Sequence, residues 1–306
     1  MIYPQTYEVL KIQGTEAEEE YYDYTIQLRL NQNCNLNCSY CHWKDGKLWN
    51  FEDIIKIIDN IKVLFDYMNF KSTKIFIHGG ESTIHPKFMD ILKYIKDTLG
   101  SVIELQTNLT MDISKWDEYI DQYSVSLHYG ELLRTGKMKM FTQNLDKIKE
   151  LYHFDIMLEK VDDKEKYYNF ILKYLNKAVE SEFIYNYMGG YNCYEDHKDF
   201  IDKYNKTTQE YLINNKIYNT NDLFENVNFK GMTCFETSQQ TFINGDGNVS
   251  ICPSGVPSGI TEGDVWFNIL TDKHFLIKFK VIYTQGFKCK WNQCLGCFYS
   301  DKIRKD

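Results

Sequence analysis

Apolar residues between positions 24 and 187 follow two spacings in turn. Residues 24–30 alternate apolar and polar side chains, as a half-buried strand does. From 51 to 70 the apolar residues instead recur every three or four positions, which predicts an amphipathic helix. The same patterns then repeat along the chain. They predict further strands at 73–78, 101–106, 123–128, 154–158 and 182–187. They also predict a helix from Pro86 onward and helices at 113–120, 138–151 and 164–178.

Six strands that alternate with helices indicate right-handed crossovers and a parallel sheet. We therefore predict an α/β fold, a partial (β/α)6 barrel, over residues 23–190. In such folds ligands bind at the carboxyl ends of the strands. The residues that follow each predicted strand are therefore the first candidates for a functional site.

The remaining segments differ from the barrel pattern. Residues 1–22 form an acidic arm, and residues 191–230 form a linker with a polar helical stretch at 197–215. Residues 231–306 contain several cysteines and two β-prone runs around an Asp-Gly turn at 241–251, which is typical of a β-hairpin. We expect these last residues to form a second, smaller module.

Charge and composition exclude several classes of protein. The 306 residues include 35 Lys and Arg against 43 Asp and Glu, a formal net charge of -8, so no basic field is present to hold nucleic acid. The N-terminus lacks a signal peptide and no apolar run could cross a membrane, so we expect a cytoplasmic protein. Nine cysteines in a reducing compartment are more often metal ligands or reactive thiols than disulfides.

Three of these cysteines directly follow the first predicted strand. Cys34, Cys38 and Cys41 form a CxxxCxxC motif at the end of the sheet where a site is expected. Soft thiolates favour iron-sulfur clusters, zinc or Cu(I), and three ligands on a four-iron cluster leave one iron open for chemistry. A zinc site completed by His42 is an alternative, as is a c-type haem at Cys38-Ser-Tyr-Cys-His42, although haem attachment normally requires export.

The motif resembles that of the radical S-adenosylmethionine (SAM) superfamily, because the aromatic Tyr40 immediately precedes the third cysteine. The resemblance implies that the three cysteines hold a 4Fe-4S cluster whose fourth iron binds SAM. It further implies reductive cleavage of SAM to a 5'-deoxyadenosyl radical that abstracts hydrogen from a substrate, with the protein supplying binding, orientation and exclusion of water.

A second segment supports the resemblance. Gly79, Gly80 and Glu81 follow the second predicted strand and resemble the family's GGEPT segment, with Ser82 in place of its proline. Two glycines let the backbone turn sharply and lie close to a ligand, and Glu81 can accept hydrogen bonds from an amino group. In isolation these residues would indicate only a turn.

Other strand ends carry further candidates. Asn108 lies in a segment that resembles the family's TNG, with Leu109 in place of the glycine, and Ser126 resembles a SAM-contacting serine. By this resemblance Asn108 and Ser126 are expected to bond the ribose and Arg134 to pair with the SAM carboxylate. Each could equally be an ordinary polar loop residue or helix cap. His128 and Glu159 could face the substrate or solvent, and we predict His128 as the base.

Five cysteines near the C-terminus form a second group. A hairpin flanked by cysteines and a later CxxC could deliver four sulfurs to zinc or to an iron-sulfur cluster. The spacing resembles the SPASM auxiliary module in its shorter Twitch form, and it is similar to that of the 2-deoxy-scyllo-inosamine dehydrogenases, which implies one auxiliary 4Fe-4S cluster. The predicted ligands are Cys234, Cys252, Cys294 and Cys297, with Cys289 as a substitute ligand or spare thiol, while Cys193 is interpreted as a lone buried thiol.

An auxiliary cluster can accept an electron from a substrate radical, so the predicted reaction is a two-electron oxidation, a dehydrogenation of a small polar substrate. One alternative is a maturase that crosslinks or epimerises a ribosomally made peptide, although only residues 1–22 precede the first strand, where such enzymes often carry a leader-binding segment. Another is a non-catalytic electron-transfer or zinc protein. Expected partners are the small-molecule or peptide substrate and a reductant such as flavodoxin or ferredoxin.

Overall fold

The fold is known from a computed structural model. It describes residues 7–13, 22–41, 46–149, 151–184, 186–187, 191–192, 194–204, 208–213, 216–219, 233–234, 239–250 and 265–288. The α-helices are α1 (Phe51–Met68), α2 (Phe88–Leu99), α3 (Tyr129–Arg134), α4 (Met138–Lys147), α5 (Lys164–Leu175), α6 (Tyr194–Tyr204) and α8 (Phe275–Gln285). Short 3-10 helices are η1 (Ser82–Ile84), η2 (Ile113–Lys115) and η3 (Asp117–Tyr119).

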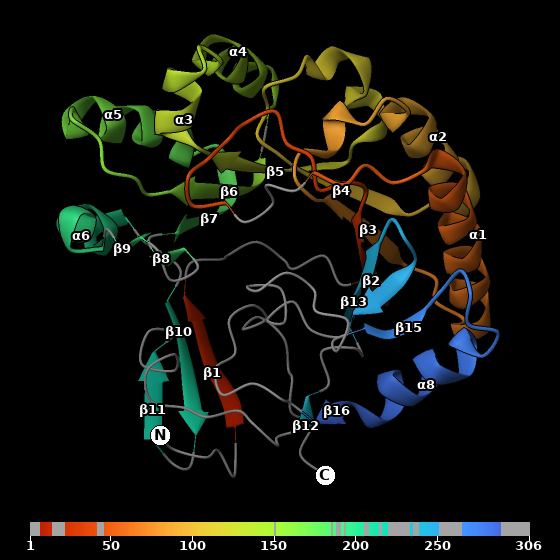
Figure 1. The fold of residues 1–306 in the computed structure, drawn as a ribbon. Coiled ribbons are helices and arrows are strands. Elements are labelled where there is room, and N and C mark those ends of the chain that lie inside the picture. Colours follow the sequence, from red (N-terminus) through yellow and green to blue (C-terminus); the bar gives the residue numbers. More distant parts are fainter. Residues whose placement is uncertain are drawn as a thin grey trace.

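One large sheet organises the described chain. Its nine strands run in the order β15 (Val265–Asn268), β14 (Asn248–Ser250), β13 (Gln240–Asn244), β2 (Tyr24–Arg29), β3 (Thr73–His78), β4 (Val102–Thr107), β5 (Gln122–Leu127), β6 (Leu151–Met157) and β7 (Ala178–Ile184). Strands β2 to β7 are parallel neighbours in chain order. Figure 1 shows the sheet curving with helices around its outside. The predicted α/β fold with six successive parallel strands is confirmed.

Alternation along each strand separates an apolar face from a polar one. Ile26 and Leu28 of β2 and Ile75 and Ile77 of β3 are fully buried. They belong to one apolar cluster with the buried stripe of α1, whose N-terminus is capped by the Asn50 side chain. Burial of these side chains under the surrounding helices is the main stabilising contribution to the barrel.

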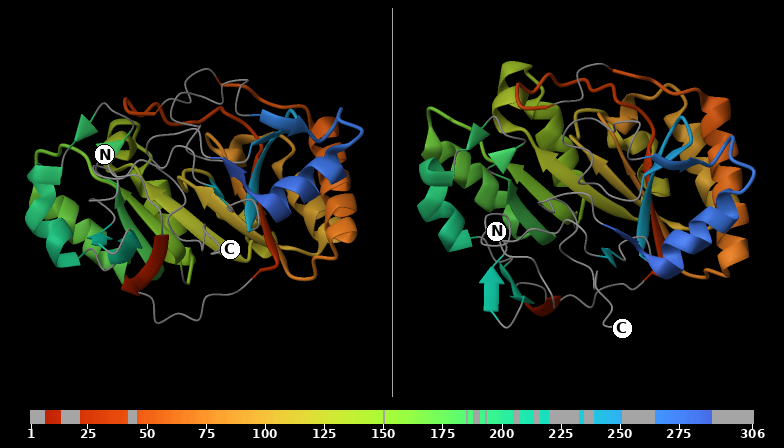
Figure 2. Two further views of the ribbon diagram at one scale, coloured as in Figure 1. Left: turned by 90° about the horizontal axis from the view of Figure 1, so that it is seen from below. Right: turned by 60° about the horizontal axis from the view of Figure 1, so that its bottom comes forward.

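The hairpin predicted at 241–251 is present as β13 and β14, but it does not stand apart from the barrel. Strand β13 pairs in parallel with β2, from Gln240 opposite Thr25 to Asn244 opposite Arg29. Gly247 adopts a φ of 83° in the turn, a conformation that favours glycine. Figure 2 shows α8 lying beside α1 at this side of the sheet. The C-terminal segment therefore extends the barrel sheet.

The remaining strands form small sheets. Strand β1 (Tyr7–Gln13) of the acidic arm pairs antiparallel with β10 (Thr208–Ile213), which pairs with β11 (Lys216–Asn219). Strand β8 (Asn186–Tyr187) pairs with β9 (Tyr191–Asn192), and β12 (Thr233–Cys234) pairs with β16 (Phe287–Lys288). The predicted helical stretch at 197–215 is therefore wrong over residues 208–213, since this β-prone run forms a strand with a distant partner.

Two other expectations are corrected. The predicted helix at 113–120 is replaced by η2 and η3, because the segment is short and Trp116 has a φ of -136°, outside the helical region. Arg134 lies in the helix α3, which the apolar spacing did not predict. The remaining boundaries shift by a few residues, as for the helix expected from Pro86, which begins at Phe88.

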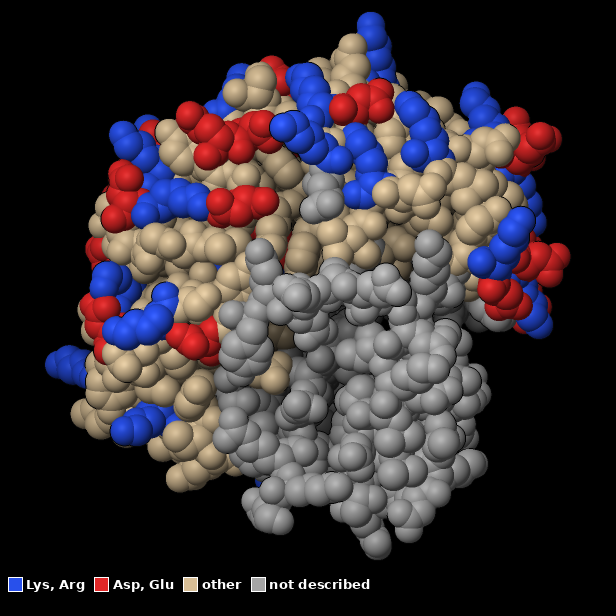
Figure 3. Space-filling view, turned by 180° about the vertical axis from the view of Figure 1, so that it is seen from behind, with Lys and Arg blue, Asp and Glu red and all other residues tan. Residues whose placement is uncertain are grey.

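The face seen from behind carries both signs of charge. Lys and Arg side chains are interspersed with Asp and Glu over its described part (Figure 3). No described helix has the length and apolar character needed to span a bilayer.

Candidate functional site

Residues 31–41, here called the cysteine loop, follow β2 at the carboxyl end of the parallel strands. Cys38 is buried, whereas Cys34 and Cys41 are partly buried. Burial raises the pKa of Cys34 to about 11 and that of Cys38 to about 12, so both thiols are protonated at neutral pH. Binding of a metal centre must therefore displace protons, as is usual for thiolate ligands.

The three cysteines of the loop supply the number of donors that a 4Fe-4S cluster with one open iron requires. Within the described ranges, no three His, Cys, Asp or Glu side chains converge on one metal-ion position. A 4Fe-4S cluster binds each of its cysteines through a different iron, so the three cysteine sulfurs need not meet at one ion position. His42, the proposed fourth zinc ligand, lies outside the described residues.

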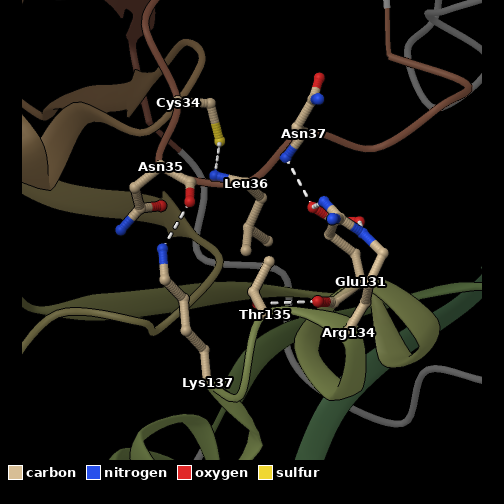
Figure 4. Close-up of polar contacts among 8 residues, drawn as sticks. All are labelled: Cys34, Asn35, Leu36, Asn37, Glu131, Arg134, Thr135 and Lys137. Carbon is tan, nitrogen blue, oxygen red and sulfur yellow. Dashed lines mark hydrogen bonds and ion pairs between the residues drawn. The ribbon is translucent and has the colours of Figure 1, made fainter.

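Helix α3 and the residue that precedes α4 contact the cysteine loop (Figure 4). The backbone N–H of Asn37 donates to Glu131 Oε1 at 2.8 Å, and Lys137 Nζ donates to the Asn35 carbonyl at 2.5 Å. Arg134 donates two hydrogen bonds to the Glu131 carboxylate, from Nε to Oε2 at 2.8 Å and from Nη2 to Oε1 at 2.6 Å. Arg134, expected to pair with a SAM carboxylate, is thus bound to a protein carboxylate in this structure.

The Gly79-Gly80-Glu81 segment is hydrogen-bonded to the backbone of the cysteine loop. Gly80 N–H donates to the Asn31 carbonyl at 3.1 Å, and Glu81 N–H donates to the Asn33 carbonyl at 2.7 Å. A Cβ atom at Gly80 would stand 2.2 Å from the Asn33 carbonyl oxygen. Glycine is therefore required here for the two backbones to approach, whatever ligand the segment also contacts.

Glu81 is 1% exposed, and its carboxylate accepts four hydrogen bonds. The Thr83 hydroxyl and N–H donate to Oε1 at 2.6 and 3.3 Å, and the Thr107 hydroxyl donates to the same oxygen at 2.9 Å. Asn108 N–H donates to Oε2 at 2.7 Å. Burial raises the pKa of this carboxyl, while the four donors oppose the shift. Glu81 thus ties the end of β3 to the end of β4.

Asn108 continues this connection to the cysteines. Its side-chain Nδ2 donates to Cys34 Sγ at 3.5 Å and to Asn35 Oδ1 at 3.0 Å. Leu109, which stands where the family has glycine, has a φ of 50° and is buried. A left-handed conformation costs such a residue roughly 1–2 kcal/mol, and burial of a leucine side chain offsets about 1.5–3 kcal/mol. The departure from the family pattern is therefore tolerated.

Ser126 lies on the polar face of the sheet, away from these contacts. Its hydroxyl donates to Asp155 Oδ2 at 3.4 Å, and Gln106 Nε2 donates to the same oxygen at 3.0 Å. Nearer the amino ends of the strands, Lys74 pairs with Glu104 at 2.8 Å. The barrel face opposite the apolar core therefore carries hydrogen-bonding groups of both charges, which suits a polar ligand.

Tyr40, His128 and Glu159 meet at the carboxyl ends of β5 and β6. The Tyr40 hydroxyl lies 2.8 Å from His128 Nδ1 and donates to Glu159 Oε1 at 3.3 Å. Burial lowers the pKa of His128 to about 4, so this imidazole is neutral at neutral pH. The predicted base thus belongs to a hydrogen-bonded group of three side chains.

Glu159 should make stability depend on pH. Burial raises its pKa from 4.5 to about 7, so the folded protein holds this proton more tightly than the unfolded chain. The contribution of Glu159 to the free energy of unfolding is therefore fully present below pH 4.5 and is lost as the pH rises through about 7. We expect Glu159→Gln to gain stability relative to wild type over this window, by up to roughly 3 kcal/mol, and the difference to level off above it.

Urea unfolding of both proteins across and above this pH window measures the difference. Glu165→Gln, at an exposed position in the first turn of α5, is the matched control. A difference between Glu159→Gln and wild type that does not change with pH would contradict the raised pKa.

Several of these partners were missed by sequence reasoning. Glu131 and Lys137 contact the cysteine loop but match no motif. Thr107 belongs to the TNG-like segment, but no contact with Glu81 was predicted for it. The only signal for Glu131 in the sequence is its place just after a predicted strand, which many polar residues share.

The C-terminal cysteines are only partly described. Cys234 lies in β12 opposite Phe287 of β16, and β16 ends one residue before Cys289 in the sequence. Cys252, Cys289, Cys294 and Cys297 lie outside the described residues, as does Cys193. The predicted auxiliary cluster therefore stays a prediction.

Two relatives match parts of the chain. A tungsten-containing aldehyde ferredoxin oxidoreductase cofactor-modifying protein from Pyrococcus furiosus is 29% identical over 109 residues, which cover 34% of this chain and 29% of the relative. A probable GTP 3',8-cyclase from Methanococcus maripaludis is 27% identical over 143 residues, which cover 42% of this chain and 46% of the relative. The chain thus spans less than half the length of either relative.

A solved structure and a family model cover more of the chain. Streptococcus suis SuiB bound to S-adenosylmethionine aligns with a TM-score of 0.50 and 14% identity, covering 86% of this chain and 64% of that chain, which supports the fold. The model of the Radical SAM superfamily matches residues 28–207, more than half of the sequence and including all three cysteines of the loop. The chain therefore belongs to the radical SAM superfamily, whose members use a 4Fe-4S cluster and SAM.

Proposed function

We propose that this enzyme oxidises a small polar substrate by two electrons. SAM bound at the 4Fe-4S cluster supplies the hydrogen-abstracting 5'-deoxyadenosyl radical, and flavodoxin or ferredoxin supplies the electron for its formation. The observation that carries the proposal is a set of polar side chains on the barrel face opposite the apolar core: Lys74, Glu104, Gln106, Ser126 and Asp155. The cysteine loop lies at the carboxyl end of this face. Such a surface can orient hydroxyl and amino groups through several hydrogen bonds.

In this proposal Cys34, Cys38 and Cys41 hold the catalytic cluster. The proposed SAM contacts are Tyr40, Gly79, Gly80, Asn108 and Ser126. Since Glu81 and Arg134 already bond to protein groups, we propose that they act mainly by holding neighbouring segments in place.

Proton removal is assigned to the group formed by Tyr40, His128 and Glu159. A neutral His128 can accept a proton, and the pKa of Glu159, raised by burial to about 7, suits proton exchange near neutral pH. The electron leaving the substrate would pass to an auxiliary 4Fe-4S cluster on the C-terminal cysteines Cys234, Cys252, Cys294 and Cys297, or with Cys289 in place of one of them.

Iron and sulfide analysis with EPR spectroscopy, on anaerobically reconstituted protein with and without SAM, tests this proposal. We expect about eight irons in the wild type and about four in a variant with alanine at Cys34, Cys38 and Cys41, with loss of the SAM-perturbed signal. Zinc at the C-terminal cysteines with about four irons would remove the electron acceptor, and would favour a redox-neutral or peptide-modifying reaction. Wild type without a SAM-responsive cluster would contradict the proposal.

A further inference from the structure

The cysteine loop is held from three sides. Glu81 and Gly80 bond its backbone from the end of β3, and Asn108 bonds Asn35 and Cys34 from the end of β4. On the third side, the α3–α4 region supplies Glu131 and Lys137 (Figure 4). These last two residues bind the peptide groups between Cys34 and Cys38, where the spacing of the first two ligands is set.

Glu131 places a buried carboxylate on the short helix α3. It is 7% exposed, and a buried carboxylate is costly unless it is paired. Arg134, whose side chain is 62% exposed, covers it from the solvent side and bonds both of its oxygens. The pKa of Glu131 is lowered mainly by this contact with Arg134, so the carboxylate is charged at neutral pH. An ionised acceptor makes a stronger bond to the Asn37 N–H than a neutral one would.

We propose that Glu131 is a positioning residue for the catalytic cluster. Its carboxylate, fixed by Arg134, holds the Asn37 peptide and thereby sets the position of the adjacent Cys38 thiolate. Lys137 holds the Asn35 carbonyl in the same way, two residues earlier in the loop. The charge of Glu131 also acts electrostatically on Cys38, so it should influence the reduction potential of a cluster bound there. This inference rests on the proposed cluster and assigns Glu131 no contact with SAM or substrate.

Two substitutions separate the contact from the charge. Glu131→Ala removes both, while Glu131→Gln keeps an oxygen that can accept from Asn37 N–H and removes the charge. Glu118→Ala, at an exposed position in η3, is the control for loss of a glutamate elsewhere. Full-length proteins are reconstituted anaerobically, and iron release to bathophenanthroline disulfonate and the midpoint potential are measured.

We expect Glu131→Ala to release iron roughly 10- to 100-fold faster than wild type, as for other residues that orient metal ligands. Glu131→Gln should release iron at a rate within about threefold of the wild-type rate. Its midpoint potential should rise, because reduction adds negative charge to the cluster, and this is less unfavourable once the nearby negative charge of Glu131 has been removed. Glu118→Ala should match wild type in both measurements.

Glu131→Ala that folds and releases iron at the wild-type rate would overturn the inference. If that variant does not fold, an unchanged midpoint potential in Glu131→Gln would overturn it instead. Wild type that binds no cluster would overturn the proposed function together with this inference, so the two failures can be told apart.

Discussion

Replacing Cys38 and Cys41 together by alanine should abolish reductive cleavage of SAM. Two of the three cluster ligands are lost, and the open iron that would bind SAM is lost with them. We expect formation of 5'-deoxyadenosine to fall to the uncatalysed background, at least about a thousandfold. The measurement is 5'-deoxyadenosine quantified by chromatography after anaerobic incubation with dithionite and SAM.

Asn37→Ala is the matched control, because its side chain is exposed and only its backbone N–H bonds to Glu131. It should retain cleavage within a few-fold of wild type. The double variant should still hold about four irons if the C-terminal cysteines bind a second cluster. Undiminished cleavage in the double variant would show that the catalytic cluster is elsewhere.

Glu81→Ala should lower the free energy of unfolding and loosen the cysteine loop. The substitution leaves two backbone N–H groups, of Thr83 and Asn108, and two threonine hydroxyls without their acceptor. Each unsatisfied buried polar group costs about 1–3 kcal/mol, and relaxation recovers part of the sum, so we expect a loss of roughly 3 kcal/mol. Urea unfolding of the metal-free protein measures it.

The comparison for this variant is Glu118→Ala, which should change stability by less than about 0.5 kcal/mol. Glu81→Ala should also lose iron after reconstitution, since Asn108 contacts both Glu81 and Cys34. If Glu81→Ala unfolds at the wild-type urea concentration, the four hydrogen bonds do not hold the ends of β3 and β4 together.

The order of elements and the cluster motif could be predicted from the sequence. Strands such as Thr73–His78 and helices such as Phe51–Met68 are encoded in apolar spacing, which is a local property. Cys34, Cys38 and Cys41 lie within eight consecutive residues, so their common site needed no knowledge of distant contacts. Together with Gly79, Gly80 and Glu81, these residues were sufficient to indicate the family, which the match over residues 28–207 confirmed.

Only the tertiary structure decided which distant residues meet. Residue Gln240 lies beside Thr25 because β13 joins the barrel sheet, and no local pattern encodes that pairing. Glu131 reaches Asn37 across 94 positions, and Glu159 reaches Tyr40 across 119. A polar residue after a strand looks the same in the sequence whether it faces solvent, caps a helix or holds a metal-binding loop. Its partner depends on strand order and loop path, which arise from packing of the whole chain.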